Sequence, residues 1–152
     1  MSTGGEPGHE HPIRTRNDTN YRYFFYDKHH GRGGSEAAQW VKDLSEDEEF
    51  SIFDQADTMD LLDSDDNLYG VRSNARTPNT AIILGTLDQE IAKFPWTRPG
   101  QPWHGFPLAP IRPTHPPHPP YRWVPGDVLK TMQARGLISE RQFKRLKKRR
   151  HL

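Results

Sequence analysis

The chain contains no cysteine, so it can form neither a disulfide bond nor a thiolate metal site. It also has no run near the roughly 18 apolar residues that a membrane helix needs, and its N-terminal residues lack the apolar block of a signal peptide. Hydrophobic residues make up only 32% of the sequence, and the mean hydropathy is −0.95. We therefore expect a soluble, cytoplasmic protein that binds no membrane and has a modest core.

The 152 residues are enough for one domain, while 14 prolines and 12 glycines indicate long loops. The composition divides the chain into a flexible tail (residues 1–19), an α/β core (20–111), a Pro/His-rich linker (112–124) and a basic helical hairpin (125–152). In the linker, polyproline II geometry separates the two histidines too far for one metal ion to join them. The linker is therefore a spacer, or a ligand for a proline-binding groove.

Lysine and arginine are absent from residues 43–66, the acidic belt, although 11 acidic residues occur there. Because the belt contains no counter-charge, we expect it to bind a protein partner. The candidate partner-binding residues are Asp54, Asp57, Asp60, Asp63, Asp65 and Asp66.

The opposite charge is concentrated at the C-terminal end, where residues 141–150 contain seven basic residues in ten. This density exceeds what a helix dipole requires. It predicts contact with nucleic-acid phosphates, with an acidic partner or with the acidic belt itself, and no base-specific reading. The candidate nucleic-acid-binding residues are Arg141, Lys144, Arg145, Lys147, Lys148, Arg149 and Arg150.

A glycine-rich turn follows the aromatic segment 21–26, which we predict to be a strand, and precedes a predicted helix over residues 36–44. Backbone amides and a helix dipole converge at such a junction and can hold an anion. The candidate anion-binding residues are Gly31, Arg32, Gly33, Gly34 and Ser35. Glu36 stands where a dinucleotide fingerprint requires glycine, so a plain connection is the alternative.

Within the belt and on to residue 72, the sequence alternates between strand and helix signals. Ser45 and Glu48 form a capping-box pattern, but the short run Phe50–Phe53 favours a strand. We expect a short helix over Gln55–Leu62 and a further strand over Leu68–Val71. This alternation predicts an α/β or α+β fold with a small sheet of about four strands and short helices.

Three residues of the following turn fit a calcium-binding loop, because Asp63, Asp65 and Asn67 occupy its positions 1, 3 and 5. The loop requires glycine and glutamate where Leu68 and Asn74 stand. We therefore predict a solvated acidic face, with no metal site and no cofactor.

The stretch 81–111 is the densest apolar region of the chain. Residues 81–84 read as a strand buried on both faces, and Thr86 with Gln89 resembles a capping box. The helix predicted there would be apolar on the face of Leu87, Ile91 and Phe94. Prolines then enforce an extended aromatic segment through Ile111, either a structural lid or an aromatic groove centred on His104.

The C-terminal hairpin has the clearest local signals. Asp127 is the predicted cap of a helix that buries Val128, Leu129 and Met132, and Gly136 ends it. A second helix follows a capping box of Ser139 and Gln142.

The chain has no nucleophile elbow, HExxH or Walker motif, so we expect a binding protein rather than an enzyme. The favoured function is that of a small non-catalytic accessory protein, antitoxin-like or immunity-like, that uses both charged regions. One alternative is a nucleic-acid-associated protein. The other is a hydrolase or nuclease acting on a phosphate-containing substrate through His29, His30 and His104.

Overall fold

A computed structural model describes residues 8–10, 23–26, 39–74, 76–77, 79–86, 89–98, 101–108 and 124–149. The elements in chain order are β1 (Gly8–Glu10), β2 (Phe24–Tyr26), α1 (Glu46–Thr58), β3 (Leu68–Val71), β4 (Ile91–Phe94), β5 (Phe106–Pro107), α2 (Gly126–Ala134) and α3 (Glu140–Arg149). Strands β3, β4 and β5 form an antiparallel sheet in that order, while β1 and β2 form a separate antiparallel pair. The fold is α+β, and the α/β layer arrangement is wrong because the paired strands of the sheet are antiparallel.

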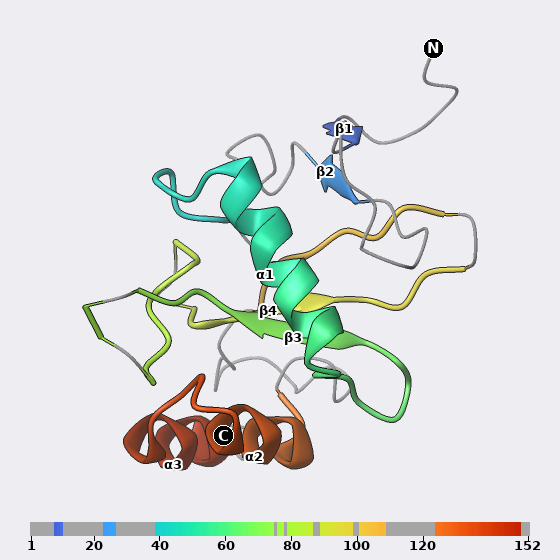
Figure 1. Cartoon of the computed structure of the whole chain (residues 1–152). Coiled ribbons are helices and arrows are strands. Elements are labelled where there is room, and N and C mark those ends of the chain that lie inside the picture. The colour runs from blue at the N-terminus through green and yellow to red at the C-terminus, as the bar shows by residue number, and fades with distance from the viewer. Residues whose placement is uncertain are drawn as a thin grey trace, which may run out of the picture.

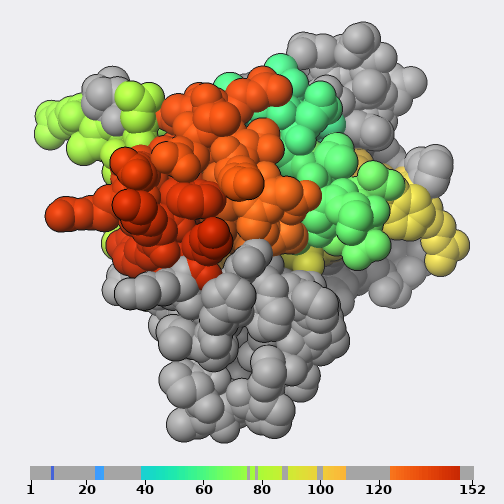
Figure 2. Space-filling view, turned by 90° about the horizontal axis from the view of Figure 1, so that it is seen from below, coloured from blue at the N-terminus to red at the C-terminus, as the bar shows by residue number. Residues whose placement is uncertain are grey.

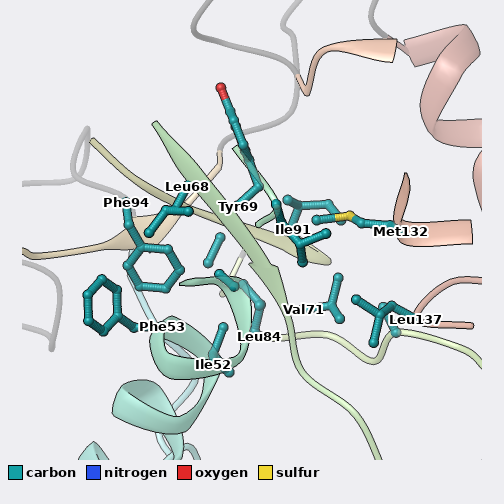
Figure 3. Close-up of a cluster of buried hydrophobic side chains, with 14 of the residues drawn as sticks. Ile52, Phe53, Leu68, Tyr69, Val71, Leu84, Ile91, Phe94, Met132 and Leu137 are labelled. Atoms are coloured by element: carbon teal, nitrogen blue, oxygen red, sulfur yellow. The ribbon is translucent and has the colours of Figure 1, made fainter. Parts of the chain in front are cut away.

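The sheet lies between α1 and the hairpin of α2 and α3 (Figure 1). All residues of β3 and β4 are buried, as expected for strands covered on both faces. Ile52 and Phe53 of α1 lie on one side of the strands, and Met132 of α2 lies beside Ile91 on the other (Figure 3). Gly70 pairs with Ala92 in the register, and these small residues let α1 approach the strands closely.

An aromatic cluster fills the space between α1 and the sheet. The ring of Phe53 lies 5.1 Å from that of Tyr23, 5.5 Å from Phe94 and 5.6 Å from Trp103. The Tyr23 hydroxyl donates a hydrogen bond to Glu49, and both side chains are fully buried. Burial, followed by the charge of Glu49, raises the pKa of Tyr23 well above its usual value.

Residues 50–53 are helical, so the predicted strand is wrong. The Ser45 hydroxyl accepts a hydrogen bond from the amide of Glu48, as the capping box predicted, and four acidic residues complement the positive end of the helix dipole. From this cap, Phe50, Phe53 and Ala56 follow at i+3 intervals on the buried face. The helix predicted for Gln55–Leu62 is the end of the same element, which stops at Thr58.

Ile91–Phe94 forms a strand, so the helix predicted to follow Thr86 is wrong. Every residue of β4 is paired with a residue of β3, and this long-range pairing overrides the helical spacing. The described part of the predicted 36–44 helix, residues 39–44, is not helical, because Trp40 pairs with Gly85 and Lys42 and Asp43 form a turn. Residues 81–84 contain one isolated bridge, from Ile82 to Arg72, rather than a fully buried strand.

Predictions for the two ends of the chain had different outcomes. Residues 8–10 form β1 within the segment predicted as a flexible tail, while the strand predicted over residues 21–26 is confirmed for Phe24–Tyr26. The hairpin is confirmed: Gly136 has a φ of +74° just after α2, and Ser139 and Gln142 exchange the expected cap hydrogen bonds. Asp127 lies in the first turn of α2 rather than at its cap, which is Pro125. The Pro/His-rich run 112–120 lies outside the described residues.

Candidate binding surfaces

The acidic belt is largely used by the fold itself. Glu49 is fully buried against the aromatic cluster, and Asp57 on the same helix is only 7% exposed. The predicted partner-binding residue Asp57 therefore lies in the interior rather than on the surface. Its position on the inward face of α1 follows from the single continuous helix, where the sequence pattern had favoured a strand and a shorter helix.

Arg72, at the end of β3, supplies the counter-charge that the belt lacks in sequence. Its guanidinium binds Glu48 at 2.7 and 3.2 Å and reaches Asp43 at 3.4 Å. It also donates a hydrogen bond to the carbonyl of Ile83 at 3.2 Å. The hydrogen bond to Glu48 is the main reason that the pKa of Arg72 is raised. The N-terminal half of the belt is thus partly neutralised and tied to the sheet.

Asp63 organises the turn that precedes β3. One carboxylate oxygen accepts hydrogen bonds from the backbone amides of Asp65 at 2.8 Å and Asn67 at 3.1 Å. The other oxygen accepts a hydrogen bond from the Tyr69 hydroxyl at 2.8 Å. These bonds account for the spacing that resembles a calcium loop, since an aspartate at the start of such a turn closes it by itself. Among the described residues, no group of three histidine or acidic side chains is placed to hold a metal ion.

The hydrogen bonds of Asp63 make the stability of the turn depend on pH. Burial raises the pKa of Asp63, but the bonds from Tyr69, Asn67 and the backbone outweigh it and lower the pKa below its usual value. A folded-state pKa below the unfolded one stabilises the protein above the unfolded pKa. This contribution is lost as the pH falls through the folded pKa.

We therefore expect Asp63→Asn to lower the free energy of unfolding near neutral pH. The difference from the parent protein should shrink as the pH drops below about 4. Urea titrations at a series of pH values measure it. Asp66→Asn is the matched control, because Asp66 is exposed in the same turn at a φ of +64°, which asparagine tolerates. A difference for Asp63→Asn that stays constant at acidic pH would contradict the assignment.

Exposed acidic side chains and exposed apolar side chains occur together on and beside the turn between α1 and β3. Asp60, Asp65 and Asp66 are exposed, Leu62 is 41% exposed and Trp96 is 52% exposed. The Trp96 amide donates to the Asn67 side chain at 2.9 Å, and Leu62 pairs with Leu68. These contacts place the segment after β4 beside the turn. We call Asp60, Leu62, Asp65, Asp66 and Trp96 the acidic turn surface. Asp54, the other predicted partner-binding residue, lies half-buried on α1.

The exposure of Trp96 differs from the sequence prediction, in which this residue belongs to a lid over the core. Trp103 does close the core, at 5% exposure against Phe53, and His104 next to it is half-buried. Trp96 instead follows the last paired residue of β4, where the sheet ends. The local sequence does not predict which of the two tryptophans is buried, because each stands among prolines.

Helix α3 is anchored to the core by Gln142, which is 5% exposed. The side-chain oxygen of Gln142 accepts a hydrogen bond from the Ala81 amide at 2.9 Å. Its side-chain nitrogen donates hydrogen bonds to the Ala81 carbonyl at 2.8 Å and to the Glu90 carboxylate at 3.1 Å. Arg145 adds an ion pair with Glu90 at 2.6 Å. The helix is therefore held on the core by two side chains, Gln142 and Arg145.

Two of the basic residues of α3 form ion pairs, and two others are exposed to solvent. Arg145 is committed to Glu90, and Lys144 lies 3.4 Å from Glu140 on the same helix, a weak surface pair. Arg141 and Lys147 are exposed as well. The side chains of Lys148 and Arg149, and the whole of Arg150, lie outside the described residues. So do His29, His30 and the predicted anion-binding residues Gly31, Arg32, Gly33, Gly34 and Ser35.

The two charged regions face different directions. Helix α3 and the turn between α1 and β3 lie on opposite sides of α2 (Figures 1 and 2). The ion pairs of α3 are made with Glu90 and Glu140, both outside the belt, and Arg72 binds the belt. The two charged regions are therefore separate surfaces of the molecule.

No helix in the described part of the chain is both long and apolar enough to cross a membrane. Comparisons of the chain with protein-family models, curated proteins and solved structures found no match. The acidic turn surface and α3 are therefore the two candidate binding surfaces of the described structure.

Proposed function

We propose that the protein is a small non-catalytic binding protein that docks another protein on its acidic turn surface. One observation carries this proposal: Trp96 and Leu62 are exposed next to three exposed carboxylates. Exposed large apolar side chains ringed by charged ones are typical of protein interfaces, and tryptophan is the most enriched residue at their energetic centres. An accessory protein of the antitoxin or immunity type would use such a surface.

The chemistry of the surface favours a basic partner segment. Asp60, Asp65 and Asp66 attract lysine and arginine side chains and raise the rate of association. The face of an exposed tryptophan attracts the same cations at short range. Apolar contact with Leu62 and Trp96 would then slow dissociation.

Trp96→Ala is expected to weaken partner binding about tenfold or more, since it removes the apolar centre of the surface. The partner is first captured with the whole protein from extracts of its native host, and its Kd is then measured with purified components. Ile83→Ala is the matched control, because Ile83 is also a large exposed apolar residue, at 43%, but lies on the segment bound by Arg72. Asp65→Asn with Asp66→Asn should slow association and reduce its salt dependence. Equal binding by the Trp96 and Ile83 variants would refute the proposal.

A second candidate function, nucleic-acid binding by α3, is favoured by the way this helix is fixed. Gln142 and Arg145 hold one side of α3 on the core, and Arg141, Lys144 and Lys147 project from the rest. Cations on a rigid helix can follow a phosphate backbone. Changing both Arg141→Ala and Lys144→Ala should weaken binding of single-stranded and of duplex DNA. The salt slope, which is the steepness with which the logarithm of the binding constant falls with the logarithm of salt concentration, should decrease by about one for each phosphate that is no longer bound. Binding that is unchanged in this variant would exclude α3 as the contact surface.

A further inference from the structure

A hollow of about 440 Å³ lies between the start of α2 and the middle of α3. Its lining combines one aromatic side chain, two lysines and one carboxylate, contributed by Gly126, Asp127, Lys130, Phe143 and Lys147. The volume falls within the roughly 300–1,000 Å³ of ordinary ligand sites. None of the sites predicted from the sequence includes Phe143 or Lys130, so this hollow is a separate feature of the folded hairpin.

Phe143 offers an aromatic face to this hollow. Its ring is partly buried against the core, which fixes its position, and the Lys147 ammonium lies 5.7 Å from the ring centre. Because Lys147 is itself exposed and its ammonium lies over the ring, the ring can be approached from the solvent side. The lysine side chain is flexible, so a flat ligand can take its place over the ring.

Two lysines supply positive charge to the lining of the hollow. Lys130 on α2 and Lys147 on α3 are both exposed, and neither forms an ion pair with another residue of the described structure. Asp127 accepts a hydrogen bond from the neighbouring Val128 amide at 3.1 Å, and its carboxylate would repel an anion at that end of the hollow. A ligand with a planar ring and a separate anionic group therefore fits best, with its anion toward the lysines.

We propose that the hollow binds one nucleotide of a single-stranded nucleic acid, with its base stacked on Phe143 and its phosphate held by Lys130 and Lys147. This inference rests on nucleic-acid binding by α3, the second candidate function. A paired base cannot enter a recess between two helices, whereas an unpaired base can leave its strand and stack on an aromatic ring. Arg141 and Lys144, outside the hollow, would hold phosphates of the adjoining nucleotides.

The test measures binding of the full chain to a fluorescent oligothymidylate of about ten nucleotides, within the usual site size, and to a duplex of the same length. Phe143→Leu keeps the apolar contact with the core but removes the aromatic ring. We expect it to weaken single-strand binding about tenfold, with little change in duplex binding or in the salt slope. Phe143→Tyr should bind like the parent protein, and Lys130→Gln should reduce the salt slope by about one.

Two results distinguish nucleotide binding in the hollow from nucleic-acid binding by the rest of α3. Parent-like single-strand binding by Phe143→Leu, together with weaker binding by the Arg141→Ala and Lys144→Ala variant, would refute the hollow but leave nucleic-acid binding by α3 intact. No binding of either probe by the parent protein would refute both. Should Phe143→Leu fail to fold, Lys147→Gln at the exposed rim provides the same comparison, and unchanged binding by it and by Lys130→Gln would overturn the inference.

Discussion

Gly70→Val is expected to lower the free energy of unfolding by about 3 kcal/mol, because β3 and α1 leave no room for a side chain at this position. A Cβ atom on Gly70 would lie 2.6 Å from the Cγ2 atom of Ile52 and 3.0 Å from the Ile52 carbonyl oxygen. The methyl group can move, but the carbonyl belongs to the backbone of α1. The helix would have to shift away from the sheet, which would loosen the packing of Phe53 against Phe94.

A double-mutant cycle separates this clash from a general effect on the strand. Gly70→Ala and Ile52→Ala are each expected to be destabilising, but together they should cost less than the sum, because Ile52→Ala removes the atom that Gly70→Ala would meet. Chemical denaturation of the four proteins measures the coupling. Glycine-to-alanine changes at unstrained positions commonly stabilise by about 0.4–1 kcal/mol. A stabilising Gly70→Ala would therefore show that α1 and β3 are not packed as described.

The C-terminal hairpin could be predicted from the sequence because its signals are local. Gly136 takes a left-handed conformation, and Ser139 and Gln142 cap the next helix through contacts three residues apart. Val128 and Met132 lie one helical turn apart on the buried face. Each of these features depends on neighbours within about one turn of the chain, and no strand of the described structure pairs with residues 124–149 to override it.

The sheet could not be predicted in the same way, since its pairing joins distant segments. Ile91–Phe94 has apolar residues at helical spacing, yet β3 recruits it as a strand. Phe50–Phe53 is short enough for a strand, yet the helix that begins at the Ser45 cap continues through it. A short apolar run is compatible with both structures, and the partner decides between them.

The same limit applied to the charged surfaces. The acidic belt was predicted to bind a partner because no cation occurs within it, but Arg72 reaches back from the end of β3 to Glu48. Asp57 and Glu49 are buried, and Asp63 is bound by its own turn. Of the exposed carboxylates that remain, Asp60, Asp65 and Asp66 belong to the turn beside Trp96, and this smaller surface can be told from the rest of the belt only in the folded structure.

Gln142→Ala is expected to lower the free energy of unfolding by about 3 kcal/mol, because one side chain joins α3 to the segment before β4. The change removes the partners of both backbone groups of Ala81 and the hydrogen bond to Glu90. Ala81 is buried, so its amide and carbonyl would be left without those bonds in the interior. Hydrogen exchange should show the loss first in the amides of α3.

Ser139→Ala is the control for the capping contribution, since it removes only the hydroxyl that accepts the Gln142 amide at 3.1 Å. It should cost about 1 kcal/mol, so an equal effect of the two variants would argue against the link to Ala81. Gln142→Ala removes no charge. If α3 nevertheless binds nucleic acid less tightly in this variant, while the salt slope is unchanged, the fixed position of the helix contributes to binding in addition to its cations.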